Sequence, residues 1–557
     1  MPVLGALFLH ASLVPGILDS AVALERAAHA ADASGQGWSI VRMDLEIALY
    51  PEEKRFELES RLRLRLERQT SLGPTLGVNL TKPIMRFTDV QADGAHVELN
   101  ATLPVAKGTR LAHVRYATPK KRGDEIEVVA RCASEGRSFQ ILVDEAFASA
   151  SWVDAWYPVP LPEQLDAFSP QVAAAAGRTT ILVPPGWAAV SNGERTERSD
   201  ERVVWETKNA VARSFAAGPL TEAVFEEGST PVRVFLLATE ALAAGEQART
   251  LGAAIRAMEK RFGRYPFASY SIVEAPDAST EWYASSEQGF IIADSAAFQV
   301  EGGNLPLFAH EAAHGWWGNT VTAKGPGSIL CSESLAQFGA LLAIEELEGE
   351  EAATRFLDSS RTGYSPRQCA KGFFSMWRSG GDKALAELED GPFDHDLSDA
   401  KGHWMFHMLR QRIGDEAFFR TLRGFLEDPA KRRTTLAAVR AAFVAAAPDA
   451  RLERFFADWL DRRGAPVLTE HWTDESSGAE HRVRLSIEQR EAPYDLDLEV
   501  DVEGADGSVR HVIHLSEARA EWVLATQGKP SKVTVDPRHR VLMWRPEYGD
   551  VPPLVGK

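Results

Sequence analysis

The spacing of the apolar residues changes twice along this chain, and that change limits the folds open to it. Large apolar residues occupy every second position from 43 to 49, which is typical of a strand with one buried face. From 452 to 460 they fall at the spacing of a single helix face. From 483 to 487 and from 496 to 502 the alternation returns. We therefore expect a multidomain α+β protein in which a helical region separates two β regions.

The first β region is predicted to begin with a hairpin. Residues 38–50 and 56–66 both alternate, and Pro51 to Lys54 between them form a turn signal. The arginines within 61–65 fall on the polar side of the alternation, so we interpret them as the solvent face of a strand. Strand-like segments continue to about residue 220. Residues 240–262 and almost all of 305–463 have helical patterns, and the tail from 466 is a candidate β-sandwich.

Length and composition narrow the class of protein. A chain of 557 residues is too long for one hydrophobic core, so several domains are expected. The formal net charge of -18 repels phosphate backbones and anionic lipids, which gives a nucleic-acid partner little support. Cys132, Cys331 and Cys369 are far apart and form no CxxC pair, so buried free thiols are expected.

The N-terminal residues leave the compartment open. Residues 1–23 are mostly apolar and end in the small-x-small triplet Ala21-Val22-Ala23, which could be a cleavage site. No Lys or Arg precedes the apolar stretch, however, and His10 and Pro15 interrupt it. A signal peptide and an ordinary extension both fit residues 1–37, so a cytoplasmic or an exported protein is expected. No later stretch reads as a membrane-spanning segment.

A metal-binding pattern lies in the helical region. His310-Glu311-Ala312-Ala313-His314 sits in an apolar run that predicts a helix, and residues four apart share a helix face. Both imidazoles can therefore bind one ion, while Glu311 points at the water that the ion holds. Two hydrogen-bonded histidines on an amphipathic helix are the alternative interpretation.

Glu333 is the candidate third ligand. It follows His314 after 18 intervening residues, on a second predicted helix. Its neighbours Leu330, Cys331 and Leu335 are apolar, and a buried carboxylate needs a cation. A surface acid is the alternative for this residue alone. The three ligands predict one catalytic zinc ion per chain, with Glu311 as the general base that takes a proton from water and passes it to the leaving amine.

The extended motif resembles the aminopeptidase N family of gluzincin metallopeptidases. The family pattern is H-E-x-x-H, eighteen residues, then Glu, and here Trp316-Trp317-Gly318-Asn319 follows the second histidine. The segments VPPGWAAVSNGE, SFAAGPL, RFGRYPF and RLERFFADWLDRRGAPVL also resemble family segments, so that the resemblance extends over residues 38–545.

The resemblance implies a domain order. It implies an N-terminal β-saddle at 38–220, a thermolysin-like, mainly helical zinc catalytic domain at 221–465, a C-terminal β-sandwich at 466–548 and a tail at 549–557. The large C-terminal helical domain of longer members has no counterpart in this sequence, and a more open active site is expected from that.

Two departures from the family pattern matter. The family's G-x-M-E-N segment is replaced by Ala284-Ser-Ser-Glu287-Gln288, in which the resemblance implies that Glu287 binds the substrate's free α-amine. A solvated strand acid is the alternative.

The second departure concerns the oxyanion region. The family's catalytic Tyr lies two residues before a Lys-Gly pair, and before Lys401-Gly402 that position holds Asp399. A phenol would stabilise the oxyanion, whereas an ionised aspartate would repel it. The residues that could substitute, each of which also fits a structural role, are His395, His403 and Tyr364.

These patterns together favour a zinc-dependent aminopeptidase that acts on peptides with a free N-terminus. One alternative keeps the zinc and the fold but is a weak or inactive family member that binds peptides, which Asp399 favours and the retained Glu311 disfavours. The other is a zinc hydrolase of a different electrophile, such as an epoxide. No spacing in the sequence predicts the side-chain preference or the oligomeric state.

Overall fold

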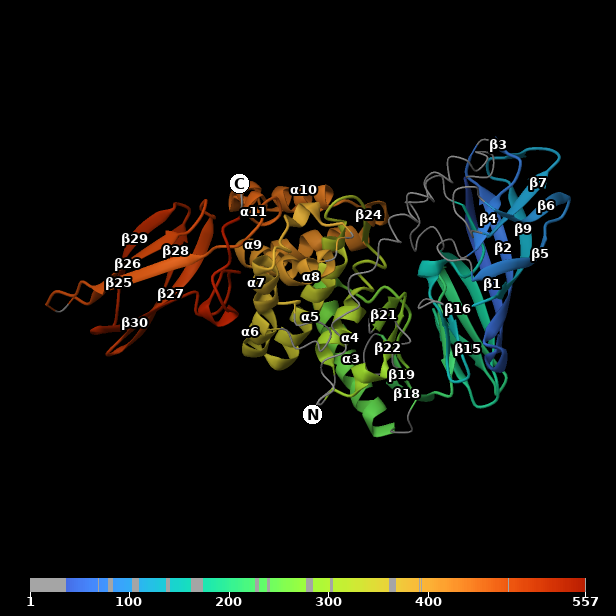
Figure 1. Cartoon of the computed structure of the whole chain (residues 1–557), viewed down its shortest axis with the longest axis horizontal. Coiled ribbons are helices and arrows are strands. Elements are labelled where there is room, and N and C mark those ends of the chain that lie inside the picture. The colour runs from blue at the N-terminus through green and yellow to red at the C-terminus, as the bar shows by residue number, and fades with distance from the viewer. Residues whose placement is uncertain are drawn as a thin grey trace. The chain divides into compact units, whose positions relative to one another are not determined.

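The structure, a computed structural model, falls into two compact units, Met1–Gly252 with Tyr265–Gly303 and Ala253–Arg264 with Asn304–Lys557 (Figure 1). It describes residues 37–555 except 69, 79–83, 103–109, 137–140, 162–173, 226–229, 238–240, 277–283, 301–303, 360–366, 390, 392 and 479. The predicted N-terminal extension, apart from Gly37, lies outside the described residues. The two units are described separately.

The predicted hairpin opens the first unit. Strands β1 and β2 pair antiparallel from Trp38 opposite Leu66 to Tyr50 opposite Arg55, which confirms the prediction. Lys54 closes the turn with a left-handed φ of 54°. Both strands lie in the middle of a sheet whose described strands follow the order β15, β16, β13, β1, β2, β9, β5. The bounds are Glu194–Arg198 (β15), Arg202–Val211 (β16), Ala175–Leu182 (β13), Trp38–Tyr50 (β1), Arg55–Leu66 (β2), Glu125–Ser134 (β9) and Met85–Gln91 (β5).

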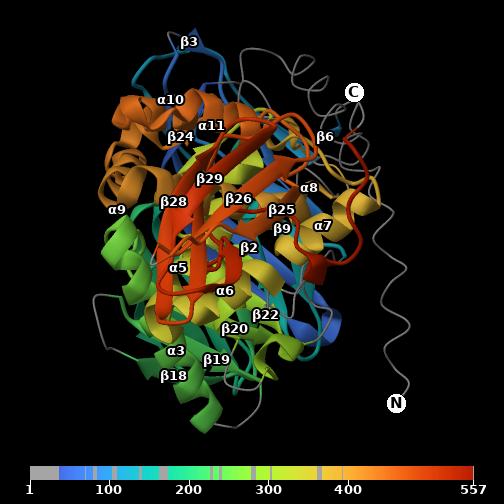
Figure 2. The same ribbon diagram turned by 90° about the vertical axis from the view of Figure 1, so that its left-hand side faces the viewer.

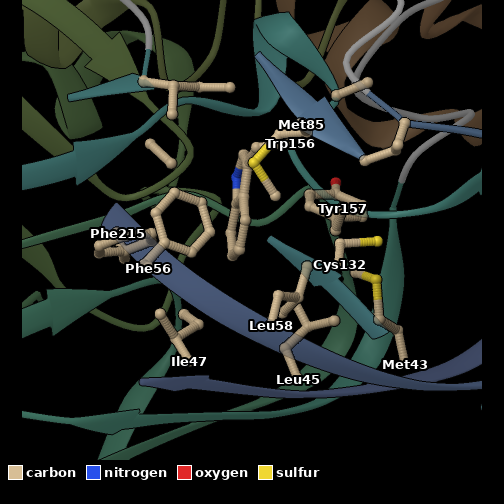
Figure 3. Close-up of a cluster of buried hydrophobic side chains, with 14 of the residues drawn as sticks. Met43, Leu45, Ile47, Phe56, Leu58, Met85, Cys132, Trp156, Tyr157 and Phe215 are labelled. Carbon is tan, nitrogen blue, oxygen red and sulfur yellow. The ribbon is translucent and has the colours of Figure 1, made fainter. Parts of the chain in front are cut away.

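The apolar face of this sheet forms the core of the first unit. Figure 3 shows Leu45, Ile47 and Leu58 of the hairpin facing the same cluster. The ring centroids of Phe56 and Trp156 lie 6.0 Å apart in an edge-on arrangement, which is a favourable geometry for aromatic pairs. The alternation read from the sequence therefore orients one side of each strand inward.

Smaller sheets complete the first unit. The five-stranded one among the described residues has the order β18, β19, β20, β22, β21, with β21 at its edge and antiparallel to β22. Its bounds are Thr221–Phe225 (β18), Val232–Leu236 (β19), Tyr270–Ala275 (β20), Phe290–Asp294 (β22) and Ala284–Glu287 (β21). The remaining described strands are Thr70–Ser71 (β3), Thr75–Val78 (β4), Ala95–Thr102 (β6), Arg110–Tyr116 (β7), Lys120–Lys121 (β8), Ile141–Val143 (β10), Ala148–Ala150 (β11), Val159–Pro160 (β12), Ala188–Ser191 (β14) and Phe215–Gly218 (β17).

Helices dominate the middle of the chain, as predicted. The helix predicted at 240–262 is α3, and the apolar stripe predicted at 452–460 is buried along α11 and the residue after it. The strands β23 (Thr322–Ala323) and β24 (Arg433–Thr434) interrupt the helical region. The α-helices among the described residues are Ala241–Phe262 (α3), Leu305–Ala313 (α4), Glu333–Glu348 (α5), Glu350–Ser359 (α6), Ala370–Arg378 (α7), Asp394–Leu397 (α8), His403–Glu427 (α9), Leu436–Ala446 (α10) and Leu452–Trp459 (α11).

The end of the chain returns to strands, drawn in orange to red in Figure 2. Among the described residues, β25, β26 and β29 form one sheet and β28, β27 and β30 another. Alternate residues of β26 and β27 are buried, as their period of two predicts. The bounds are Leu468–Asp474 (β25), Arg482–Gln489 (β26), Leu496–Gly504 (β27), Gly507–Leu515 (β28), Arg519–Ala525 (β29) and Pro530–Val535 (β30).

One expectation about the helical region needs correction. Within the described part of the chain, the stretch Ser328–Glu348 is long and apolar enough to cross a membrane, although no such stretch was expected. Most of it is buried inside the protein, because α5 packs against α4 and α9. Its apolar character therefore matches a core helix, and length and composition alone are weak grounds for a membrane span.

Helices α4 and α5 approach each other closely at Gly339. A Cβ added to Gly339 would lie 2.5 Å from the Cβ of Ala313, far inside van der Waals contact. Only glycine fits there without moving one of the helices. The separation of α4 and α5 is thus set by one residue without a side chain.

We predict that Gly339→Ala destabilises the protein by about 1–3 kcal/mol, because overpacking outweighs the gain in helix propensity. The matched control is Gly424→Ala in α9, where an added Cβ meets no atom within 4 Å. That variant should be stabilised by up to about 1 kcal/mol. Thermal unfolding of both variants gives the comparison. Equal stabilisation of the two would show that α4 and α5 are not in close contact at Gly339.

Candidate metal centre

Two short helical segments bring the three predicted ligands together. His310 lies in the last turn of α4, and His314 is the residue that follows α4, still with helical φ and ψ of -57° and -22°. Glu333 is the first residue of α5. The i, i+4 spacing places both rings on one side of α4, toward the start of α5. The structure therefore brings together all three residues that the sequence singled out.

The ligand atoms form a nearly equilateral triangle. His310 Nε2 and His314 Nε2 lie 3.2 Å apart, and each lies 3.5 Å from Glu333 Oε2. An ion held tetrahedrally at about 2.0–2.2 Å from each ligand separates its ligands by roughly 3.3–3.6 Å. The triangle thus fits a zinc ion without rearrangement.

The outer nitrogens of the two rings are also fixed. His310 Nδ1 lies 2.8 Å from Gln337 Oε1, and His314 Nδ1 lies 3.0 Å from the carbonyl oxygen of Trp317. Because an oxygen acceptor calls for a proton on Nδ1, both Nε2 atoms keep a lone pair for the ion. The sequence analysis missed Gln337. Its signal is that it follows Glu333 by one helical turn, within an otherwise apolar stretch.

The charges around the triangle call for a cation. Burial alone would lower the pKa of His314, but the Glu333 carboxylate and Glu311 raise it to about 9. Burial opposes ionisation of Glu333 too, yet His314 and His395 hold its pKa well below the usual range. The histidines attract protons because buried carboxylates surround them. A divalent ion would supply the same positive charge.

Glu311 is buried beside the triangle, in α4. Burial raises its pKa above the usual carboxyl value, opposed by the nearby His310 and His314. A carboxylate with a raised pKa is better matched to taking up a proton near neutral pH.

Asp399 is buried in a π-helical turn, Ser398–Gly402, that joins α8 to α9. This turn packs on the start of α5, where Ser334 Oγ donates to the carbonyl of Ser398 at 2.6 Å. A side chain at Gly402 would overlap Ser334. The Asp399 carboxylate accepts a hydrogen bond from Gln368 Nε2 at 2.7 Å. Such turns frequently mark functional sites in helices.

The residues that could substitute for a phenol have different environments. His395 Nε2 lies 3.2 Å from Glu333 Oε2, and the side chain of His395 is 42% exposed. His403 is fully buried, and burial lowers its pKa to about 4, so it is a neutral core residue. Tyr364 lies outside the described residues.

Glu287 lies in the first unit, at the end of edge strand β21, and is 1% exposed. Ser214 Oγ and Ser151 Oγ donate to its Oε2 at 2.5 and 3.1 Å, and Ser285 Oγ donates to its Oε1 at 3.1 Å. The alternative of a solvated strand acid is therefore wrong. The three serines, distant from one another in sequence, were not predicted.

Comparisons with known proteins agree with this reading of the helical region. Residues 250–459 match the Peptidase family M1 domain. Aminopeptidase N of Streptomyces lividans is 23% identical over 383 residues, which are 63% of this chain and 43% of that protein. Aminopeptidase N of Lactococcus lactis subsp. lactis is 26% identical over 174 residues, 30% of this chain and 20% of that protein. Aminopeptidase N of Lactobacillus delbrueckii subsp. lactis is 28% identical over 165 residues, 29% and 19% of the two chains. The chain spans less than half the length of these relatives.

We predict that Gln337→Leu weakens zinc binding by roughly 10- to 100-fold, because His310 loses the acceptor that orients its ring. Zinc affinity of the purified protein, measured by competition with a chromophoric chelator, gives the result. Gln411→Leu is the control, since Gln411 lies on the exposed side of α9 and bonds Arg540. Equal zinc affinity in the Gln337 variant and the wild type would exclude Gln337 from the support of the ion.

Proposed function

We propose that this protein is a zinc-dependent aminopeptidase, because residues 250–459 match the Peptidase family M1 domain, in agreement with the resemblance to the aminopeptidase N family. The observation that carries the proposal is the triangle of His310, His314 and Glu333, whose edges of 3.2 to 3.5 Å suit a zinc ion. We further propose the domain order that the resemblance implies, namely β-saddle, thermolysin-like catalytic domain and β-sandwich.

The metal would be held by three protein ligands with one position left for solvent or substrate. Zinc in such a site lowers the pKa of water and polarises a carbonyl group. The contribution of the chain is to fix the ligands through Gln337 and the Trp317 carbonyl, and to provide the negative charge that retains the ion.

Glu311 is proposed as the general base. It accepts a proton from the water that attacks the carbonyl carbon of the scissile peptide bond. When the C–N bond breaks, Glu311 returns that proton to the leaving amine nitrogen. Its burial next to His310 and His314 supports this assignment, since burial raises the pKa of the carboxyl group.

Glu287 is proposed to bind the α-ammonium group of the substrate, the role implied by the resemblance. Three serine hydroxyls donate hydrogen bonds to its carboxylate and orient it, and the carboxylate is buried, where a charge-assisted contact is strong. An ammonium group would form such a contact with the oriented carboxylate.

A peptide-binding protein with little or no hydrolysis is the second candidate. Asp399 favours it, because the oxyanion region has no phenol at that position. Glu311 opposes it, since a metal site kept for structure needs no general base.

We predict that Glu311→Gln lowers kcat on an aminoacyl-coumarin substrate by roughly 10²- to 10⁴-fold, because the amide cannot accept the water proton. Zinc content should not change. The wild-type signal should vanish with a chelator and return with added zinc. Full turnover in the variant would remove Glu311 from the mechanism. If the wild type shows no chelator-sensitive hydrolysis of any substrate, the peptide-binding protein is favoured.

We predict that Glu287→Ala raises KM for substrates with a free amino terminus, because a buried charge-assisted contact is lost. N-acetylated versions of the same peptides are the control, and their kinetics should hardly change. Steady-state kinetics on both sets gives the comparison. Equal effects on free and acetylated substrates would mean that Glu287 does not recognise the amine.

A further inference from the structure

His395 stands at the metal centre without belonging to its triangle. Its Nε2 lies 3.2 Å from Glu333 Oε2, and its Nδ1 lies 3.4 Å from Asp399 Oδ2. Among the described residues, Glu333, His395 and Asp399 form one cluster of potential ligand atoms, and Glu333 with the two histidines forms another. The two clusters share only Glu333, so His395 is a neighbour of the ion site and is not placed as a fourth ligand.

Both ring nitrogens of His395 face carboxylate oxygens. A carboxylate oxygen only accepts hydrogen bonds, so the ring acts as the donor wherever it bonds to one. Nε2 lies next to the ligand Glu333, on a side chain that is 42% exposed. A substrate atom at the metal centre can therefore reach this donor, which the fully buried His403 does not offer.

Asp399 lies on the Nδ1 side of the His395 ring and is fixed there by its own contacts. Gln368 Nε2 donates to the same oxygen, Oδ2, that faces His395. The π-helical turn that carries Asp399 is anchored to α5 through Ser334 and Ser398. Asp399 is fully buried, and its place one helical turn after His395 puts both on one face. The carboxylate therefore orients His395 and does not itself point into the open side of the site.

On this geometry we propose that His395 is a catalytic hydrogen-bond donor, oriented by Asp399, that stabilises the substrate's carbonyl oxygen as it becomes negatively charged. The inference rests on the proposed peptidase function and identifies the group that takes over from the missing phenol. Only a hydrogen bond forms and breaks. The proton stays on His395 Nε2 while water attacks, and it is still there when the C–N bond has broken.

The expected size of the effect distinguishes this role from support of the fold. Loss of one oxyanion donor costs about 10²- to 10³-fold in kcat, with a smaller effect on KM. His395→Ala should show that loss with zinc content unchanged. His395→Gln keeps an N–H donor and should recover part of it. Asp399 is a positioning residue, so Asp399→Asn, which keeps an acceptor for His395, should retain more activity than Asp399→Ala.

The decisive experiment measures binding to the zinc-loaded protein by calorimetry. The probes are a peptide phosphinate, whose tetrahedral oxygens are negatively charged, and the matching reduced-amide peptide, which has no such oxygen. In His395→Ala the phosphinate should bind about 100-fold more weakly while the reduced amide binds as before. The control is His514→Gln in β28, because His514 is also partly exposed, at 38%, and pairs with Asp497. It should change neither affinity.

Two results would overturn the proposal. If the phosphinate and the reduced amide lose affinity together in His395→Ala, the ring has no preference for the charged oxygen. If zinc affinity falls and phosphinate binding to the reloaded variant is normal, His395 only supports Glu333. Failure of the peptidase function itself would look different, since the wild type would then bind no zinc or would hydrolyse no peptide.

Discussion

The close contact between α4 and α5 determines what the rest of the site can do. Gly339 lets the helices meet at Ala313, and the same pair of helices carries His310 at one end and Glu333 at the start of the other. Three ligand atoms then lie within 3.5 Å of one another, and buried carboxylates lie beside the two histidines. Such an arrangement is costly unless a cation compensates it. The packing of α4 against α5 therefore also positions the metal ligands.

A network of side-chain contacts begins and ends at the metal ligands. His310 bonds Gln337, the Gln337 amide donates to the carbonyl of Gln368 at 3.5 Å, and Gln368 donates to Asp399. Asp399 lies next to His395, and His395 lies next to Glu333, so the network ends at a ligand of the metal triangle. If His395 is the proposed oxyanion donor, Asp399 belongs to the network that orients it.

The sequence predicted what depends on local periodicity. The hairpin at 38–66, the helix at 240–262, the stripe on α11 and the alternation in β26 and β27 all follow from residues near each other in the chain. The three metal ligands could be predicted, because His310 and His314 have the spacing of one helix face and Glu333 follows on a second predicted helix. The sequence could not predict the roles of Gln337, Gln368 and the serines around Glu287, because only tertiary packing brings these residues to their partners. The sequence analysis named His395 without placing it, because the π-helical turn Ser398–Gly402, which contains Lys401-Gly402, follows His395 and was not predicted. The membrane criterion failed for α5 because a buried core helix and a membrane helix share their composition.

The central claim, one zinc ion held by His310, His314 and Glu333, is tested most directly by zinc K-edge X-ray absorption of the purified protein. The account predicts one tightly held zinc with about four nitrogen and oxygen neighbours near 2.0–2.1 Å, including two imidazoles. Replacement of Glu333 by Ala should remove one oxygen neighbour or the ion itself. A sulfur neighbour near about 2.3 Å, a single imidazole, or a protein that retains no zinc would contradict it.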